Sequence, residues 1–504
     1  MNSNVVKTLL ESGSGSDVAL TAPGRPDMTF DGLRAHCASL RRQLAARDIG
    51  PGDRVAIVLP NGPEMASAFL GVASGLSAAP LNPSYKEQEY AFYLEDLKPK
   101  LLIMAAGNDN PARAAAVGLG IPIADAVFTD DMPAGAFKLW DDESDSTDPT
   151  PEDEALVLHT SGTTSRPKVV PLTQANLYAS AGNIADVIAL TPDDHCLNIM
   201  PLFHIHGLIA VVLASMKAGA SVCCTPGFNA LKFLDLATAE NPTWYSGVPT
   251  MHQTILLRAK RNADAIAKLK FRFVRSSSAS LPPAVFHELS ETFGCPVIEA
   301  YGMTEATHQM ASNPLPPKVQ KPGCVGLPAG PEIKIFLPDG TEAATGSIGE
   351  VCIRGDNVTP GYENNAKANA ESFTNGWFHT GDQGVLDGDG YLKITGRLKE
   401  IINRGGEKVS PLEVDDVLMY HPAVQQVVTF AVPHKMLGED VAAAVVLADG
   451  AAVTEKELQT YASKKLAPFK VPKTFVFLEE IPKGDTGKMQ RIGLAEKLGL
   501  GGDQ

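Results

Sequence analysis

Residues 155–188 read ALVLHTSGTTSRPKVVPLTQANLYASAGNIADVI, which is an apolar run, a loop of hydroxyl and glycine residues, and a helical stretch. A short apolar run bounded by turn residues is typical of a buried strand in a parallel sheet. Arg54–Leu59 (RVAIVL) is a second such run, and helical stretches follow at Glu64–Ser74 and Leu231–Ala239. Strands that alternate with helices predict an α/β architecture with helices on both faces of the sheet.

The chain changes character after about Pro328. Residues 332–355 read EIKIFLPDGTEAATGSIGEVCIRG, a strand, a Pro-Asp-Gly turn and a second strand. Further along, VVTFAVP, DVAAAVVLA and TFVFLEEIP are strand-like and KELQTYASKKL is helical. We therefore predict a large N-terminal body of α/β layers with a small antiparallel, barrel-like subdomain in residues 1–396. A hinge at 397–400 and a small, mobile α+β lid domain at 401–504 complete the prediction.

The composition excludes several classes of protein. The 504 residues carry 43 Lys and Arg against 58 Asp and Glu, a formal net charge of −15. This acidity argues against a nucleic-acid partner, which needs a basic surface, and against a basic membrane-surface protein. Seven scattered cysteines without a CxxC pair indicate neither a disulfide framework nor a structural zinc site. With no secretory signal or membrane-spanning apolar run, we expect a cytoplasmic, multidomain enzyme.

The loop Leu158–Lys168 carries the strongest chemical signal. Its glycine and hydroxyl residues offer backbone N–H groups and short O–H donors to phosphate oxygens, and Lys168 adds a positive charge. The loop is not a Walker loop, because no Gly-Lys-Ser/Thr ends a G-x-x-x-x-G-K frame. The pattern therefore predicts a phosphate-binding loop of another kind.

Other motifs follow this loop in a fixed order along nearly the whole chain. They are PLFH (201–204), YGMTE (301–305), GE (349–350), GY (361–362), TGD (380–382), GRLKE (396–400), NRGGE (403–407), PK (482–483) and TGK (486–488). Together with the loop, they resemble the adenylate-forming superfamily of acyl-CoA synthetases, adenylation domains and luciferases. Such enzymes use ATP and Mg²⁺ to convert a carboxylate into an acyl-adenylate, whose mixed anhydride the CoA thiol then attacks.

The resemblance implies a nucleotide site. Its residues would be Thr160, Ser161, Gly162, Thr163, Thr164, Lys168, Glu299, Ala300, Tyr301, Gly302, Asp382 and Arg397. Tyr301 would stack on adenine, and Asp382 would accept both ribose hydroxyls. Arg397 would contact the ribose and phosphate at the domain junction.

The resemblance also implies the catalytic groups, which are Lys488, His204, Thr304 and Glu305. Thr304 would contact the α-phosphate, and the Glu305 carboxylate would bind Mg²⁺, a cation that prefers oxygen ligands. Lys488 would stabilise charge that grows in the transition state of adenylation.

Two further positions concern the thiolation step. Lys399 falls at the hinge about which the small domain would rotate between the adenylation and thiolation poses. Gly405 and Gly406 would let a strand edge approach the pantetheine arm of CoA closely, because glycine has no side chain.

The expected acid pocket is polar. The segments FHIHG (203–207), VRSSSAS (274–280) and ATHQ (306–309) supply a run of three consecutive serines and several histidines. Fatty-acid and aryl-acid enzymes usually carry small apolar residues in the second segment. Buried polar groups need partners, which a small acid with a second carboxylate would supply. These segments resemble the oxalate–CoA ligase branch, so we expect oxalate as substrate, bound by His204, Ser278, Ala279 and His308.

Two alternatives share every nucleotide motif. A ligase for a medium-chain fatty acid or an aryl acid of the 4-coumarate type would differ in its pocket. A stand-alone adenylation enzyme would differ in its thiol acceptor, a carrier protein in place of CoA.

Overall fold

A nine-stranded sheet forms the centre of the molecule in the computed structural model, which describes residues 4–160, 167–483 and 489–502. Its strands from β9 to β13 run parallel, and β14 pairs antiparallel with β13 at one edge. In spatial order the strands are β15 (Leu327–Pro328), β14 (His308–Ser312), β13 (Val297–Met303), β12 (Phe273–Ser276), β11 (Trp244–Gly247), β9 (His195–Asn198), β10 (Ser221–Cys224), β1 (Val18–Thr21) and β2 (Met28–Thr29).

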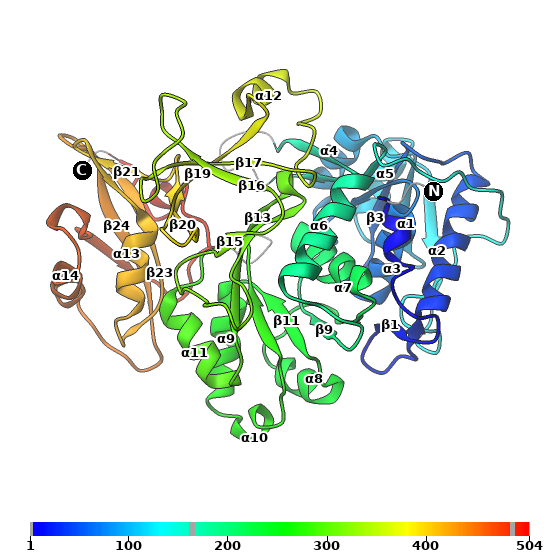
Figure 1. Cartoon of the computed structure of the whole chain (residues 1–504), viewed down its shortest axis with the longest axis horizontal. Coiled ribbons are helices and arrows are strands. Elements are labelled where there is room, and N and C mark those ends of the chain that lie inside the picture. Colours follow the sequence, from blue (N-terminus) through cyan, green and yellow to red (C-terminus); the bar gives the residue numbers. More distant parts are fainter. Residues whose placement is uncertain (1–3, 161–166, 484–488, 503–504) are drawn as a thin grey trace.

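A second, six-stranded sheet lies within the N-terminal part of the chain (Figure 1). Its strands are β6 (Ile123–Ala126), β5 (Leu101–Ala105), β3 (Arg54–Val58), β4 (Ser77–Pro80), β7 (Glu154–His159) and β8 (Val169–Thr173). The apolar runs predicted as buried parallel strands are β3 and β7, although β7 also pairs antiparallel with β8.

Helices form three layers around the two sheets. One core cluster combines strands of both sheets with α2 (Phe30–Ala45), α3 (Pro63–Ala73), α6 (Gln174–Val187), the π-helix η1 (His206–Leu213) and α7 (Ala214–Ala218). The short α1 (Val6–Leu9) packs against α3 and α6. A second cluster covers the outer face of the nine-stranded sheet with α8 (Phe233–Glu240), α9 (Pro249–Ala259) and α11 (Pro283–Phe293). A third covers the outer face of the six-stranded sheet with α4 (Glu87–Leu97) and α5 (Ala112–Gly118).

The local sequence explains where these helices begin. Thr173 caps α6: its hydroxyl accepts from the backbone N–H of Asn176, whose side chain bonds back to the N–H of Thr173. This reciprocal arrangement satisfies two backbone donors that a helix otherwise leaves unpaired. α3, α9 and α11 carry a proline in their first turn, where its missing N–H costs nothing.

The antiparallel subdomain predicted after Pro328 is present. It is a five-stranded sheet of β16 (Glu332–Phe336), β17 (Gly349–Arg354), β19 (Trp377–Leu386), β18 (Phe373–Thr374) and β20 (Leu392–Arg397). The predicted strand-turn-strand unit is the antiparallel pair β16–β17. The helix α12 (Ala366–Ser372) precedes β18.

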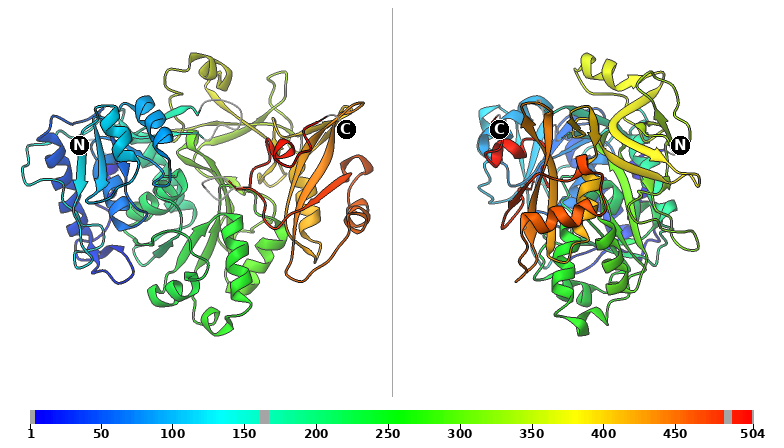
Figure 2. Two further views of the ribbon diagram at one scale, coloured as in Figure 1. Left: turned by 180° about the vertical axis from the view of Figure 1, so that it is seen from behind. Right: turned by 90° about the vertical axis from the view of Figure 1, so that its left-hand side faces the viewer.

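The C-terminal part forms a separate five-stranded sheet, which lies at the opposite end from the N-terminal part (Figure 2). Its strands are β22 (Glu407–Val409), β21 (Ile402–Arg404), β24 (Gly438–Leu447), β23 (Val424–His434) and β25 (Thr474–Phe477). The helices α13 (Pro411–Met419) and α14 (Glu455–Ser463) cover one face, and α15 (Leu494–Lys497) packs on the other. The predicted fold class is thus confirmed.

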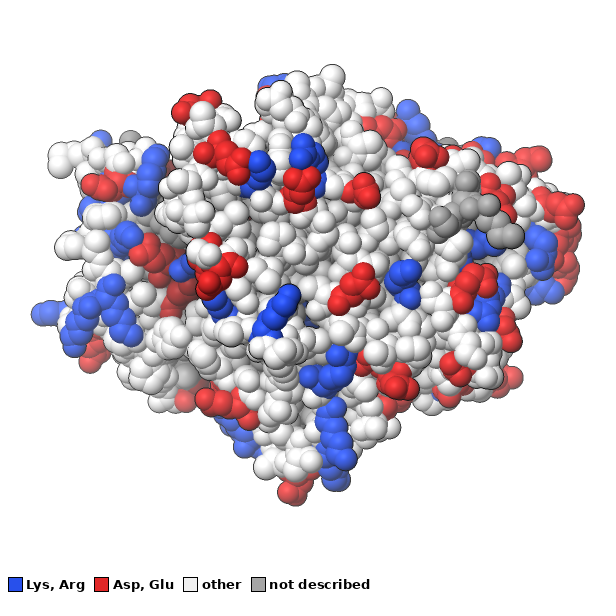
Figure 3. Space-filling model, in the orientation of Figure 1, with Lys and Arg blue, Asp and Glu red and all other residues white. Residues whose placement is uncertain are grey.

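The surface carries charges of both signs. Figure 3 shows basic and acidic side chains interspersed over one face, with acidic groups gathered along the edge where the N-terminal part lies. Among the described residues, no helix has the length and apolar character needed to cross a bilayer.

A partly buried ion-pair network joins segments that are far apart in sequence. Arg54 on β3 donates to both oxygens of Glu154 at 2.7 Å and to Glu363 at 2.5 Å. The side chains of Arg54 and Glu154 are only 15% and 18% exposed. Removing the arginine would leave two carboxylates facing each other in a site with little water.

We predict that Arg54→Met lowers the free energy of the first urea-unfolding transition by about 2–4 kcal/mol, because it leaves these partly buried carboxylates without their cation. The matched control is Arg113→Met, which breaks the more exposed ion pair with Asp125 and should cost less than about 1 kcal/mol. Equal small losses in both variants would contradict a structural role for the Arg54 network.

Candidate active site

The site is built on the continuation of β13 past the parallel sheet. β13 turns at Thr304 in the short 3₁₀ helix η2 (Thr304–Ala306), and β14 returns antiparallel from His308. Where the two strands meet, a Cβ built at Gly302 would lie 1.7 Å from the carbonyl oxygen of His308. Only glycine permits this approach. As a result Tyr301, Thr304 and His308 are held at one edge of the sheet.

A segment of the antiparallel subdomain forms hydrogen bonds to the backbone of this turn. The amide of Asn357, which is 1% exposed, donates to the carbonyl oxygens of Ala306 at 2.7 Å and Gln309 at 2.8 Å. The backbone N–H of Thr359 donates to the carbonyl oxygen of Glu305 at 2.7 Å. These bonds hold both flanks of His308, whose φ of 89° is strained for a non-glycine residue.

The predicted adenine and ribose residues are in contact. The Tyr301 hydroxyl donates to Oδ2 of Asp382, and Oδ1 of Asp382 lies 3.2 Å from Nε of Arg397. Asp382 and Arg397 face each other across the β19–β20 ladder. Burial, followed by the Asp382 charge, raises the pKa of Tyr301, and the same carboxylate raises the pKa of Arg397. The arrangement orients a carboxylate between an aromatic ring and a cation.

The predicted metal ligand lies in a second group. Glu305 is 7% exposed, and its Oε1 accepts a hydrogen bond from the Tyr362 hydroxyl at 2.8 Å. Lys168 Nζ lies 4.1 Å from the centre of the Tyr362 ring, within the range of a cation–π contact. Tyr362 belongs to the quoted GY motif, but we assigned it no role from the sequence. It links the phosphate-loop lysine to the carboxylate.

The two loops with the greatest predicted importance are described only at their bases. Thr160 and Lys168 close the first loop: the N–H of Thr160 donates to the Lys168 carbonyl at 3.0 Å, and the Lys168 N–H donates to Oγ1 of Thr160 at 3.3 Å. Ser161, Gly162, Thr163 and Thr164 lie outside the described residues, as does Lys488. The second loop leaves and re-enters through an antiparallel bridge between Lys483 and Met489.

The expected acid-pocket residues converge on a histidine that we had not selected. His206 opens the π-helix η1 and is fully buried; its Nδ1 lies 3.0 Å from Oγ of Ser278, and its ring centre lies 5.1 Å from that of His308. The His206 backbone N–H donates to Nδ1 of His204 at 3.3 Å. Ser278 has a φ of 74°, so two pocket positions have strained backbones. Ala279 is exposed beside Ser278.

Behind this group lies a buried arginine, which was also missed. Arg275 on β12 is fully buried, and its NH1 group lies 3.3 Å from both Nε2 of His206 and Oγ of Ser246. Its NH2 group donates to Oε1 of Gln309 at 3.0 Å. Burial lowers the pKa of Arg275 to about 9, so the guanidinium keeps its charge at neutral pH. The signal in the sequence was a single arginine inside the short strand FVRS, whose four residues are all buried.

Two predicted nucleotide residues have buried side chains. Glu299 is 1% exposed, and its Oε1 accepts from the backbone N–H of Leu281 at 2.9 Å; burial raises its pKa to about 8. We therefore now propose a structural role for the Glu299 side chain, namely to hold the turn before α11. Ala300 is 3% exposed, and its carbonyl oxygen accepts from Oγ of Ser277 at 2.9 Å.

The predicted hinge lies in an exposed turn. Lys399 stands between β20 and β21, and the turn is closed by the N–H groups of Glu400 and Ile401 donating to the Arg397 carbonyl. Gly405 and Gly406 form the two-residue turn of the β21–β22 hairpin, with φ of 60° and 96°. Positive φ at both positions explains why glycine stands there.

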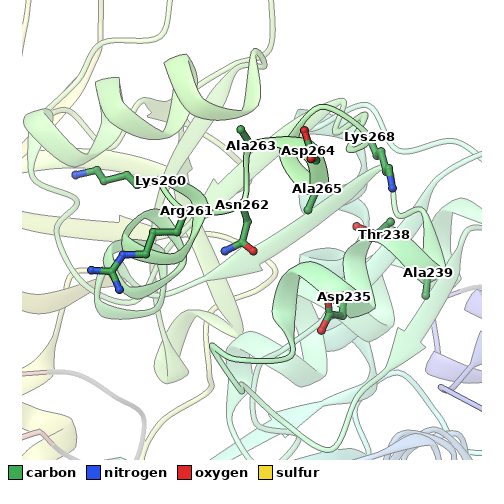
Figure 4. A pocket seen from close by; sticks show the side chains of 10 residues that line it. All are labelled: Asp235, Thr238, Ala239, Lys260, Arg261, Asn262, Ala263, Asp264, Ala265 and Lys268. Atoms are coloured by element: carbon green, nitrogen blue, oxygen red, sulfur yellow. The ribbon is translucent and has the colours of Figure 1, made fainter.

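Two other features do not belong to the site. Glu350, Cys352 and His379 cluster, but Nδ1 of His379 lies 2.8 Å from Glu350 Oε2 and 3.3 Å from Cys352 Sγ, so direct hydrogen bonds account for the group. A hollow near α8 and α10 (Ala263–Ile266) is lined by scattered charges such as Asp235 and Lys268 (Figure 4). In Figure 1, α8 and α10 lie at the bottom of the view, below β13 and β15.

The chain matches known proteins over nearly its whole length. The profile of the AMP-binding enzyme family matches residues 12–363, and that of the AMP-binding enzyme C-terminal domain matches residues 413–488. The chain is 45% identical to the oxalate–CoA ligase of Arabidopsis thaliana, with 98% of this chain and 99% of that protein covered. It is 35% identical to the sulfoacetate–CoA ligase of Cupriavidus necator, with 93% and 92% covered. The ATP-bound structure of MatB from Rhodopseudomonas palustris has a TM-score of 0.89 at 29% identity over 99% of both chains.

We predict that Gly302→Ala lowers kcat by at least about 100-fold, because the added methyl group would push β14 away and displace His308 by the order of an ångström. The effect is measured as the steady-state rate of AMP formation. Gly388→Ala is the matched control, since nothing lies within 4 Å of its Cβ position. Full activity of Gly302→Ala would show that the close approach is not required.

Proposed function

The chain belongs to the AMP-binding enzyme family, and from this we propose that it is an ATP-dependent acid–CoA ligase whose acid substrate is oxalate. In the first step the acid carboxylate attacks the α-phosphate of ATP, forming an acyl-adenylate and releasing pyrophosphate. In the second step the CoA thiol attacks the acyl carbon, forming the thioester and releasing AMP.

The observation that supports oxalate is the polar acid pocket beside the nucleotide residues. His206 is in contact with His204, Ser278 and His308. His308 follows Thr304 by four residues in the chain. Because Nδ1 of His204 accepts the His206 N–H, a neutral His204 carries its proton on Nε2 and can donate it to an acid. An octanoyl or coumaroyl chain has no second acidic group that the Ser278 hydroxyl and the imidazoles of this pocket could bind. The two similar ligases are both named for small acids with two acidic groups.

The nucleotide would lie between the two halves of the site. We propose that Tyr301 stacks on adenine, that Asp382 accepts the ribose hydroxyls and that Arg397 contacts ribose and phosphate. A carboxylate has about four acceptor positions, so Asp382 can bind ribose while it keeps its bonds to Tyr301 and Arg397. The loop between Thr160 and Lys168 would bind the phosphates.

Mg²⁺ fits the second group of residues. A single buried carboxylate, Glu305, oriented by Tyr362, suits a cation that keeps most of its ligands as water and phosphate oxygens. When bound there, the ion would neutralise charge on the phosphates of ATP. Thr304, at the start of the same short helix, would contact the α-phosphate.

The C-terminal domain, proposed as residues 401–504, would supply Lys488 for adenylation. Arg491, just after this loop, bonds to Asp415 at 2.9 Å and lies 3.3 Å from Glu400, so the loop base is tied to the junction. Rotation about Lys399 would then bring the turn at Gly405 and Gly406 to the CoA channel.

All seven cysteines are free thiols, which supports a reducing compartment such as the cytoplasm.

We predict that kcat/KM for oxalate exceeds that for octanoate and 4-coumarate by at least about tenfold, since only a short acid with two charges satisfies the polar pocket. The measurement is pyrophosphate release with each acid at saturating ATP and CoA. A preference for octanoate or 4-coumarate would contradict the proposal. If a thioester formed only on a carrier protein, the carrier protein and not CoA would be the thiol acceptor.

A second prediction concerns Lys488. Lys488→Ala should lower ATP–pyrophosphate exchange by about 10²–10³-fold, because it removes the charge that stabilises the adenylation transition state. Thioester formation from supplied oxalyl-adenylate should change by less than about threefold. Lys483→Ala is the control, because Lys483 forms only a surface ion pair with Glu480 at 2.8 Å. Equal losses in both half-reactions would refute the assignment.

A further inference from the structure

Arg275 is a buried cation without an anionic partner in the described part of the chain. Its side chain is fully buried, it forms no ion pair with any described Asp or Glu, and its Nε has no hydrogen-bond partner. Burying a charge in this way is expensive unless another group compensates for it. Since the guanidinium lies directly behind the proposed acid pocket, an acid anion is the group that can compensate.

The hydrogen bonds around Arg275 favour one direction. A guanidinium donates and cannot accept, so the NH1 group, 3.3 Å from Nε2 of His206, favours the tautomer in which Nε2 is an acceptor. The hydroxyl of Ser246, which accepts from the same NH1 group at 3.3 Å, lies 2.7 Å from Nε2 and in this tautomer shares its lone pair as a second donor. His206 then carries its proton on Nδ1.

The same donor-to-acceptor order extends from His206 to Ser278 in the proposed acid pocket. With its proton on Nδ1, His206 donates to Oγ of Ser278 at 3.0 Å. Ser278 has no other hydrogen-bond partner among the described residues, so its own O–H is left to donate elsewhere. The backbone of Ser278 is itself strained, with a φ of 74°.

We propose that Arg275 is a positioning residue that selects a dicarboxylate acid: through His206 it makes Ser278 a donor toward the carboxylate that does not react with ATP. The proposal rests on the proposed function and assigns a residue outside the expected acid pocket. Gln309, held by the NH2 group of Arg275 at 3.0 Å, keeps the guanidinium plane in place.

The first test needs no variant. In full-length protein labelled with ¹⁵N-histidine, the His206 resonance, identified by its loss in His206→Gln, should be that of a neutral ring protonated on Nδ1. A ring protonated on Nε2, or on both nitrogens, would overturn the proposal. This result does not depend on which acid the enzyme prefers.

The second test uses Arg275→Met, which has nearly the same length without charge or donors. We expect the KM for oxalate to rise about tenfold or more, the KM for ATP to stay within about twofold, and the Nδ1 tautomer of His206 to be lost. Arg275→Lys, which keeps the charge, should recover part of the oxalate KM. Arg272→Met is the control: Arg272 begins the same strand region but pairs with Asp194 at 2.8 Å, so its loss should leave the oxalate KM unchanged.

The outcomes separate the two proposals. If wild-type enzyme does not prefer oxalate, the proposed function fails, and the Arg275 variants are then measured with the acid that it does prefer. If wild-type enzyme prefers oxalate but Arg275→Met lowers kcat equally for all acids and leaves the tautomer unchanged, Arg275 is only structural and the inference fails. Should Arg275→Met not fold, the wild-type spectrum and Arg275→Lys still decide the question.

Discussion

The approach of Gly302 to the carbonyl oxygen of His308 is the constraint on which the site depends. It lets β13 continue beyond the parallel sheet and lets β14 return beside it, so the nucleotide residues and the acid residues share one edge. The turn between them carries Thr304 and Glu305, which would lie at the reacting phosphate. Asn357, in the turn that follows β17, holds this turn in place, and thus the antiparallel subdomain supports the proposed site as well as the fold.

The net charge of the chain does not describe the charges around the proposed site. The chain carries a net charge of −15, yet its proposed substrates are all anions. Positive charge is concentrated at a few positions that are buried or held by partners: Arg275 behind the acid pocket, Lys168 over the Tyr362 ring and Arg397 against Asp382. The fully buried Arg275 acts more strongly than a surface charge would, whereas the half-exposed Arg397 acts through its direct contact with Asp382. The acidic surface and the anion-binding site are therefore compatible.

Much of the fold could be read from local patterns. The apolar runs at β3 and β7, the helix at α6 and the β16–β17 hairpin all follow from periodicity and turn residues. The strand β8 between the phosphate loop and α6 was missed, because VVPLT is short and contains a proline. The order of strands in the nine-stranded sheet could not be read, since pairing between distant segments leaves little trace in local sequence.

The sequence by itself determined the family and led to the proposed nucleotide residues, because those side chains belong to short motifs whose spacing is visible in one dimension. Only the tertiary structure decided that the expected acid residues meet around His206, that Arg275 lies behind them and that the Glu299 carboxylate is turned away. The physical reason is that the residues of this group come from β11, β12, η1 and β14, which are separate in the sequence. A chain of hydrogen bonds between side chains of several strands can form only when those strands are packed together.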